Sequence, residues 1–208
     1  PPAGQPELPP MVVAGRLAIR QHHVDGFVAR AWIQARLQGV ADGVCLFRRD
    51  QRAIALVDRN APLPAFDGTA LPYGNGRSYG DSCLNPGGTV LRTRGLDRFV
   101  EFDPATGVLR CEAGVTLSEI IDLALAQGWF LPVTRGTRHV TVGGAIANDV
   151  HGKNHHRAGT FGHHVLALEL LRSGGERRVL MPDDESGLFG ATVAGLGLTG
   201  VITWAALQ

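Results

Sequence analysis

A glycine-rich loop that directly follows a predicted strand constrains this chain more than any other feature of its sequence. An apolar run at residues 69–73 predicts the strand, and the segment GNGRSYGD begins immediately after it at Gly74. The loop differs from a Rossmann fingerprint, because Tyr79 occupies the place of the third glycine and no helix follows. A P-loop is excluded as well, since no Gly-Lys-Ser/Thr is present. Two interpretations remain: a glycine-rich turn without a ligand, or a nest of backbone N–H groups that binds a pyrophosphate.

Residues 136–152 form a second segment that is nearly devoid of bulky side chains. Gly143 and Gly144 are followed by Ala145 and Ala147, so a flat aromatic ligand can lie close to the backbone there. Tight packing of a helix on a sheet is the alternative, but it does not explain the polar end of the segment at residues 148–151. Glycine makes up 28 of the 208 residues and shows no three-residue period, which indicates many close approaches of main chain rather than collagen.

Composition and charge exclude several classes of protein. The 20 Lys and Arg and 19 Asp and Glu leave a net charge of +1, which gives little drive for binding nucleic acid. The basic pairs at residues 48–49 and 177–178 are interpreted as solvated loop charges. No apolar run reaches the length of a transmembrane segment, and no secretory signal pattern is present, so we expect a cytoplasmic or membrane-peripheral protein. The three cysteines form no CxxC pair, which argues against a disulfide framework or a zinc site.

The pattern of apolar residues predicts an α+β fold with a mainly antiparallel sheet flanked by helices. Thr116 and Glu119 form a capping-box pattern, and Gly128 supplies an end for the helix that follows. Further helices are predicted at 24–37, 50–58 and 186–193, and strands at 45–47, 69–73, 89–92, 98–102, 108–112, 165–171, 179–181 and 199–207.

Five histidines cluster between residues 151 and 164. His151 and His155 have the spacing of metalloprotease ligands, but Gly152 stands where the catalytic glutamate of that motif belongs. We therefore expect no metal site. A single histidine that acts as an acid, a base or a polar wall of a pocket agrees better with the sequence.

The chain resembles the PCMH-type FAD-binding domain of the vanillyl-alcohol-oxidase superfamily from about residue 45 to residue 208. Residues 73–81, residues 141–156 with their HGKNHH run, and the later GLTGVI carry the resemblance. Within the superfamily, the chain is similar to FAD-linked oxidoreductases of the decaprenylphosphoryl-β-D-ribose 2'-oxidase type. The resemblance implies an N-terminal extension at 1–43, a small α+β subdomain at about 44–100 and a larger one at about 101–208. The C-terminal substrate domain of the family is expected to be absent from these residues.

The resemblance also implies a bound FAD and assigns residues to it. Many members tether the flavin through a histidine at the position of Arg77, so we expect non-covalent FAD here. Tyr79, His151 and Lys153 are expected to face the substrate as catalytic residues. The residues expected to bind FAD are Pro72, Tyr73, Gly74, Asn75, Gly76, Arg77, Ser78, Tyr79, Gly80, Asp81, Ser82, Gly136, Thr141, Val142, Gly143, Gly144, Asn148, Asp149, Val150, His151 and Ile202.

The activity implied by the resemblance is oxidation of a secondary alcohol of a sugar that serves as a precursor of cell wall polysaccharide. The substrate is expected to be a small sugar, free or lipid-linked, and family analogy adds a short-chain dehydrogenase as a partner. Two alternatives stay open: an aldonolactone oxidase of the D-arabinono-1,4-lactone type, and a truncated flavin-binding module without activity.

Overall fold

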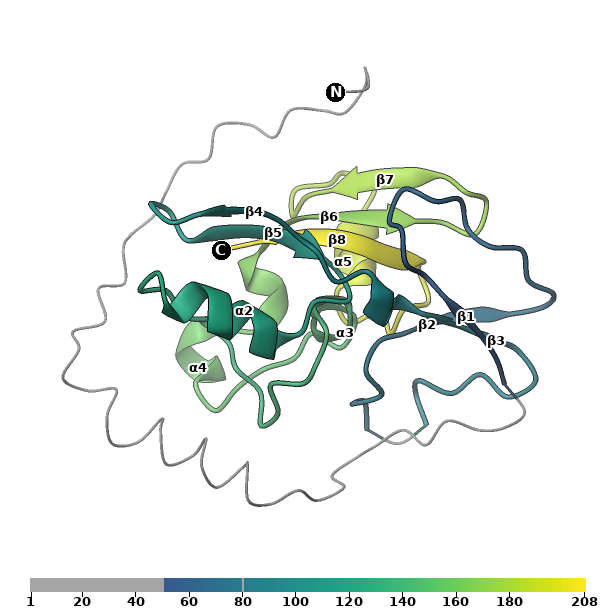
Figure 1. Cartoon of the computed structure of the whole chain (residues 1–208), viewed down its shortest axis with the longest axis horizontal. Coiled ribbons are helices and arrows are strands. Elements are labelled where there is room, and N and C mark those ends of the chain that lie inside the picture. The colour runs from purple at the N-terminus through teal and green to yellow at the C-terminus, as the bar shows by residue number, and fades with distance from the viewer. Residues whose placement is uncertain (1–50, 80) are drawn as a thin grey trace. The chain divides into compact units, whose positions relative to one another are not determined.

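The computed structural model of this protein describes residues 51–79 and 81–208, which belong to one compact unit spanning residues 39–208. The described residues form two β-sheets and four short α-helices (Figure 1). The smaller sheet is parallel, with the order β1–β3–β2, and the larger is antiparallel, with the order β4–β5–β8–β6–β7. The strands are β1 (Arg52–Ala55), β2 (Ala70–Tyr73), β3 (Thr89–Arg92), β4 (Phe99–Asp103), β5 (Val108–Glu112), β6 (Val165–Leu171), β7 (Arg177–Leu180) and β8 (Val201–Leu207).

Helices cover one face of the larger sheet (Figure 1). Side chains of β5, β6 and β8 pack there against α2 and α3 in the main hydrophobic core, in which Val115, Ile146 and Leu168 are fully enclosed. The two central strands β6 and β8 are apolar along almost their whole length, as expected for strands that are buried on both faces. The helices are α2 (Leu117–Leu125), α3 (Val142–Ala147), α4 (His155–Ala158) and α5 (Leu188–Thr192), and 3-10 turns occur at Thr93–Gly95 and Phe161–His164.

Helix α2 begins as its sequence predicts. The Thr116 hydroxyl accepts a hydrogen bond from the Glu119 backbone N–H at 3.3 Å, and the Glu119 carboxylate accepts one from the Thr116 N–H at 2.7 Å. Both halves of the capping box are therefore formed. The helix then buries Leu117, Ile120 and Ala124 on one face.

Helix α3 lies unusually close to the end of β5. A β-carbon on Gly143 would be 3.2 Å from the β-carbon of Ala113, so the missing side chain allows this approach. The sequence predicted only a turn at Thr141–Gly144. Glycine has a low helix propensity, and this short helix forms because the Thr141 hydroxyl caps it and its apolar face is buried.

Partly buried polar contacts attach the segment between β1 and β2 to the larger sheet. Arg177 donates hydrogen bonds to the Ala61 carbonyl at 2.6 Å and to the Glu169 carboxylate at 2.9 Å. The Arg59 Nε atom lies 3.8 Å from Glu112 Oε1. These contacts join the segment to strands β5 and β7.

Several predictions differ from the structure. The helix expected at 50–58 is wrong: this segment contains β1, which pairs with β3 and places Ile54 and Leu56 on one apolar face with a period of two residues. The other strands and helices predicted after residue 60 are present, although α3, α4 and the parallel pairing of the smaller sheet were not predicted. The helix expected at 24–37 and the strand expected at 45–47 lie outside the described residues.

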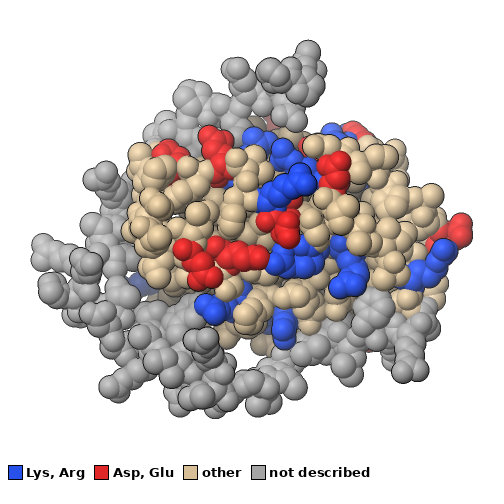
Figure 2. Space-filling model, viewed as in Figure 1, with Lys and Arg blue, Asp and Glu red and all other residues tan. Residues whose placement is uncertain are grey.

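Charged side chains of both signs are interspersed on the face of the molecule in Figure 2, in agreement with the net charge of +1. Among residues 51–79 and 81–208, no helix has the length and hydropathy needed to cross a membrane.

Cys83 takes part in a disulfide bond, which the cysteine spacing had not led us to expect. Cys111 is free and buried.

Candidate functional site

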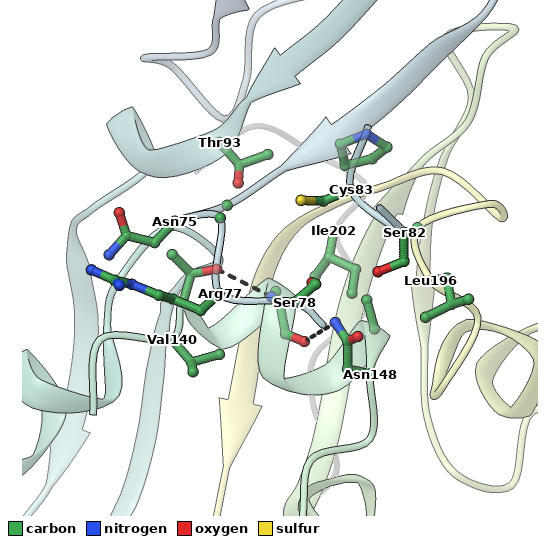
Figure 3. A pocket seen from close by; sticks show the side chains of 18 of the residues that line it. Asn75, Arg77, Ser78, Ser82, Cys83, Thr93, Val140, Asn148, Leu196 and Ile202 are labelled. Carbon is green, nitrogen blue, oxygen red and sulfur yellow. Dashed lines mark hydrogen bonds between the residues drawn. The ribbon is translucent and has the colours of Figure 1, made fainter. Parts of the chain in front are cut away.

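A cleft of about 760 Å³, open to solvent, lies where the glycine-rich loop meets α3 and β8 (Figure 3). The loop comes from the smaller sheet, whereas α3 and β8 pack in the core of the larger one. The residues that line the cleft are Pro72, Gly74, Asn75, Gly76, Arg77, Ser78, Ser82, Cys83, Thr93, Arg135, Val140, Thr141, Gly143, Gly144, Ala147, Asn148, Leu196, Gly197, Gly200 and Ile202.

The loop after β2 presents a row of backbone donors. Within the part of the chain that the structure describes, none of the N–H groups of residues 74–79 donates to a protein acceptor. Gly76 is buried and has a φ of +60°, a conformation that side chains disfavour, so the glycine is required for this turn. A run of free N–H groups in such a loop is suited to binding the oxygens of an anion.

Side-chain hydrogen bonds hold the loop from both sides. Asn75 donates through Nδ2 to the His139 carbonyl at 2.8 Å, and the Thr93 hydroxyl donates to the Tyr73 carbonyl at 3.3 Å. Figure 3 shows Asn75 and Thr93 at the wall of the cleft. The loop is thus attached to two segments that follow it in the chain, the 3-10 turn after β3 and the segment before α3.

The charges at the cleft are all positive. Of the described residues that line it, only Arg77 and Arg135 carry a charge at neutral pH, and no carboxylate lines it. The Arg77 Nε atom is buried and finds no acceptor among the described residues. A buried donor without a partner is costly, so the arrangement suits an anionic ligand that supplies the acceptor.

The start of α3 contributes close approach rather than free donors. The N–H groups of Val142 and Gly143 donate to the carbonyls of Val115 and Ala113, each at 2.8 Å. The Gly144 N–H donates to the Thr141 hydroxyl, and Asn148 Nδ2 donates back to the Gly144 carbonyl at 2.9 Å, as the dashed lines in Figure 3 show. The glycines therefore leave room for a ligand without hydrogen-bonding it through these three amides.

The fold and the cleft define a nucleotide-binding domain of the flavoprotein type. Free loop amides, an unpaired guanidinium nitrogen and a glycine surface on α3 fit a dinucleotide with an anionic pyrophosphate and a flat ring system. The model of the FAD binding domain family matches residues 64–180, more than half of the chain, so the chain belongs to this family and its cofactor is FAD.

The chain is also similar to individual proteins of this kind. It is 50% identical over 139 residues to decaprenylphosphoryl-beta-D-ribose oxidase of Mycolicibacterium smegmatis, which covers 66% of this chain and 30% of that protein. It is 52% identical over 94 residues to an uncharacterized protein of Streptomyces coelicolor, with coverages of 45% and 25%. A putative D-arabinono-1,4-lactone oxidase of Neurospora crassa is 30% identical over 111 residues, with coverages of 52% and 20%. The chain spans less than a third of the length of these relatives.

The cleft brings together many of the residues that were expected to bind FAD, but not all of them. Val142 and Val150 are buried in the main core, and the Asp149 carboxylate accepts the Gly162 N–H at 2.9 Å. Gly136 is exposed, and a β-carbon at this position would meet nothing within 4 Å, whereas Gly80 lies outside the described residues. Those that line the cleft are Pro72, Gly74, Asn75, Gly76, Arg77, Ser78, Ser82, Thr141, Gly143, Gly144, Asn148 and Ile202; those that do not are Tyr73, Tyr79, Asp81, Gly136, Val142, Asp149, Val150 and His151.

The three residues expected to face the substrate are exposed and lie outside this cleft. Tyr79 is 72% exposed, and the Arg135 guanidinium lies 4.6 Å from the centre of its ring. The His151 ring lies 5.1 Å from the His155 ring, and Lys153 is exposed beside them in sequence. Their roles stay predictions.

The sequence did not point to several lining residues. Cys83 and Thr93 belong to no motif, and Arg135 lies 58 residues from Arg77, which it contacts. Val140 and Ala147 lie in the segment 136–152 but were not assigned to the cofactor. A signal was present for Leu196, Gly197 and Gly200, since they belong to a glycine-rich stretch before β8.

Thiol and metal chemistry find no support in the described residues. Burial, with the negative charges of Glu112 and Glu119, raises the pKa of the Cys111 thiol to about 12, so it is not a nucleophile at neutral pH. No group of three or more His, Cys, Asp or Glu side chains between residues 51 and 208, Gly80 apart, is arranged to hold a metal ion.

Proposed function

We propose that this chain is the FAD-binding domain of an oxidoreductase that oxidises a secondary alcohol of a sugar. The observation that carries the proposal is the 50% identity with a ribose oxidase over 139 residues, a stretch that is two thirds of this chain. The free amides of the loop and the cationic cleft support the binding of FAD itself. The domain division that we propose places the smaller subdomain at about 44–100 and the larger at about 101–208.

Each group in the cleft has a proposed task toward FAD. The amides of residues 74–79 and the Arg77 guanidinium would bind the pyrophosphate, because both supply donors that have no protein acceptor. Gly143 and Gly144 would allow close approach of the cofactor, and Ile202 would contact its adenosine part. When bound, FAD supplies the acceptor for the hydride that leaves the alcohol carbon.

The chain's own contribution to the chemistry would be the handling of a proton. Oxidation of an alcohol releases the hydroxyl proton along with the hydride, and a base at the reacting hydroxyl takes it up. His151 is the candidate, because it follows Asn148, which lines the cleft, by three residues and its imidazole is exposed. Tyr79 and Lys153 would orient the sugar beside it.

A lactone oxidase is a second candidate. The 30% identity with a putative D-arabinono-1,4-lactone oxidase favours it, although over a shorter stretch of this chain.

We also propose that the sugar substrate is free or lipid-linked, that a short-chain dehydrogenase acts with the protein, and that the protein is cytoplasmic or peripheral to a membrane.

The cofactor proposal is tested with purified protein and added FAD. We expect a flavin absorption spectrum and a rise in melting temperature with FAD concentration, since a ligand that binds only the folded state stabilises it. Precipitation of the holoprotein should release all the flavin into the supernatant, because Arg77 cannot form the histidyl bond. Colour that stays on the precipitated polypeptide would refute non-covalent binding. Turnover of sugar and lactone substrates by protein that carries this domain separates the two candidate activities.

A further inference from the structure

The side chain of Arg135 contacts the loop after β2 in two separate places. Its Nη1 atom donates a hydrogen bond to the Arg77 carbonyl at 3.2 Å. Its guanidinium also lies over the Tyr79 ring, with 4.6 Å between the guanidinium carbon and the ring centre. The two contacts fall on either side of Ser78, so Arg135 spans the middle of the loop.

The segment that carries Arg135 is itself firmly attached to the larger sheet's helices and loops. The Pro132 carbonyl accepts a hydrogen bond from Asn154 Nδ2 at 2.9 Å, and the Arg138 carbonyl accepts one from the Ser118 N–H at the start of α2 at 2.8 Å. Arg135 is half-buried between these attachments. It therefore acts on the loop from a fixed position.

The hydrogen bond to the Arg77 carbonyl sets the orientation of a loop amide. In a trans peptide the C=O of one residue and the N–H of the next point in opposite directions. No peptide bond among the described residues is cis, so an Arg77 carbonyl that points to Arg135 directs the Ser78 N–H away from it. That N–H is one of the loop donors without a protein acceptor.

Arg135 also contributes charge. It is one of the two ionisable residues of the described chain that line the cleft, and both are cations. A second positive charge beside the loop favours an anion with more than one negative charge, because attraction in a partly enclosed site is weakly screened.

We propose that Arg135 is a positioning residue for the phosphate-binding loop: it fixes the direction of the Ser78 N–H and adds positive charge for a pyrophosphate. The inference rests on the proposed FAD site. Arg135 acts through the loop and takes no part in the oxidation.

The test is the affinity of the apoprotein for FAD, measured from the quenching of flavin fluorescence. Arg135→Ala should weaken FAD binding by about 10- to 100-fold, the range for losing one hydrogen bond and charge at an anion site. Arg135→Lys keeps the charge and one donor and should recover part of the affinity, whereas Arg135→Gln should recover less. The control is Arg92→Ala on β3, because Arg92 is exposed and does not line the cleft.

Competition by ADP distinguishes a role of Arg135 at the pyrophosphate from a general effect on the stability of the fold. ADP carries a pyrophosphate but no flavin, so Arg135→Ala should weaken ADP and FAD to a similar extent while the melting temperature of the apoprotein stays near that of the wild type. An unchanged FAD affinity in Arg135→Ala, with Gly76→Val losing it, would overturn the inference and leave the FAD site intact. A loss for FAD without a loss for ADP would also overturn it. Failure of the wild-type protein to bind FAD would overturn the site and the inference together.

Discussion

Gly74 lies so close to Thr141 that a β-carbon at position 74 would overlap the Thr141 hydroxyl oxygen. The same oxygen accepts the Gly144 N–H at 3.2 Å and caps α3. The loop after β2 and helix α3 therefore meet at one hydroxyl group. Both surfaces line the cleft, so this contact sets the width between the two sides of the proposed cofactor site.

Gly74→Ala should weaken FAD binding by about tenfold or more and lower the free energy of unfolding by about 1 kcal/mol, the typical cost of losing a cap. Alanine must move either the loop or the Thr141 hydroxyl. Adding Thr141→Ala removes the overlapping oxygen, so the double variant should bind FAD more tightly than Gly74→Ala alone. Flavin titration and urea denaturation measure the two effects. Gly174→Ala is the control, because nothing lies within 4 Å of that position, and an equal loss in both glycine variants would contradict the explanation.

Gly76→Val should abolish retention of FAD while the protein still folds. The φ of +60° at Gly76 is strained for any side chain and most for a β-branched one, so valine would force the loop out of the conformation that presents its amides. The measurement is the flavin content of protein purified in the presence of FAD, with circular dichroism to confirm folding. Occupancy equal to that of the wild type would mean that the loop is only a turn.

The sequence predicted best those elements whose signals are local. Helix α2 has a complete capping box within four residues, and β6 and β8 are apolar runs of strand length. Strand β1 was mistaken for a helix because four residues carry too little periodicity, and its stability comes from pairing with β3, which lies far along the chain. Pairing of this kind cannot be seen in a local pattern.

The residues of the site were also predicted only where a local sequence pattern marks them. The glycines of the loop marked it as a candidate ligand site, with a turn that binds no ligand as the alternative, because glycine allows backbone conformations that other residues disfavour. No sequence pattern indicated a role for Arg135, because this arginine belongs to no motif and the carbonyl that it contacts is 58 residues away. Val142 and Val150 were assigned to the cofactor from their place in a motif, yet both are buried in the main core. Val142 lies at the start of α3, where neighbours of a lining residue face elsewhere, and Val150 follows the helix after a short turn.

Acid should weaken the protein partly through Glu119. Burial opposes ionisation of its carboxyl, but hydrogen bonds from the Thr116 N–H and hydroxyl and from Arg94 outweigh it and lower the pKa of Glu119 below the ordinary 4.5. The unfolded chain therefore takes up this proton first as the pH falls below about 4.5, and the stabilisation is lost as the pH falls through the folded pKa.

Glu119→Gln should reduce the loss in free energy of unfolding on acidification, because glutamine still completes the capping box but does not titrate. Urea denaturation at pH 7, 5 and 4 measures the free energy of unfolding of both proteins. The wild type should lose more free energy of unfolding between pH 5 and pH 4 than the variant does. Equal losses in the two proteins would show that other carboxyl groups account for the acid response.

His151→Ala should separate cofactor binding from chemistry. The side chain is exposed and does not line the cleft, so we expect the affinity for FAD to stay within about twofold of the wild type. If His151 accepts the hydroxyl proton, reduction of the bound flavin by sugar should slow by about 10²- to 10⁴-fold, as for other general bases, in protein that carries this domain and turns over substrate. Stopped-flow absorbance of the flavin measures the rate. The neighbouring His156→Ala is the matched control, since its imidazole is also exposed and was assigned no role. Equal rates in His151→Ala and the wild type would reduce His151 to a loop residue beside the cofactor.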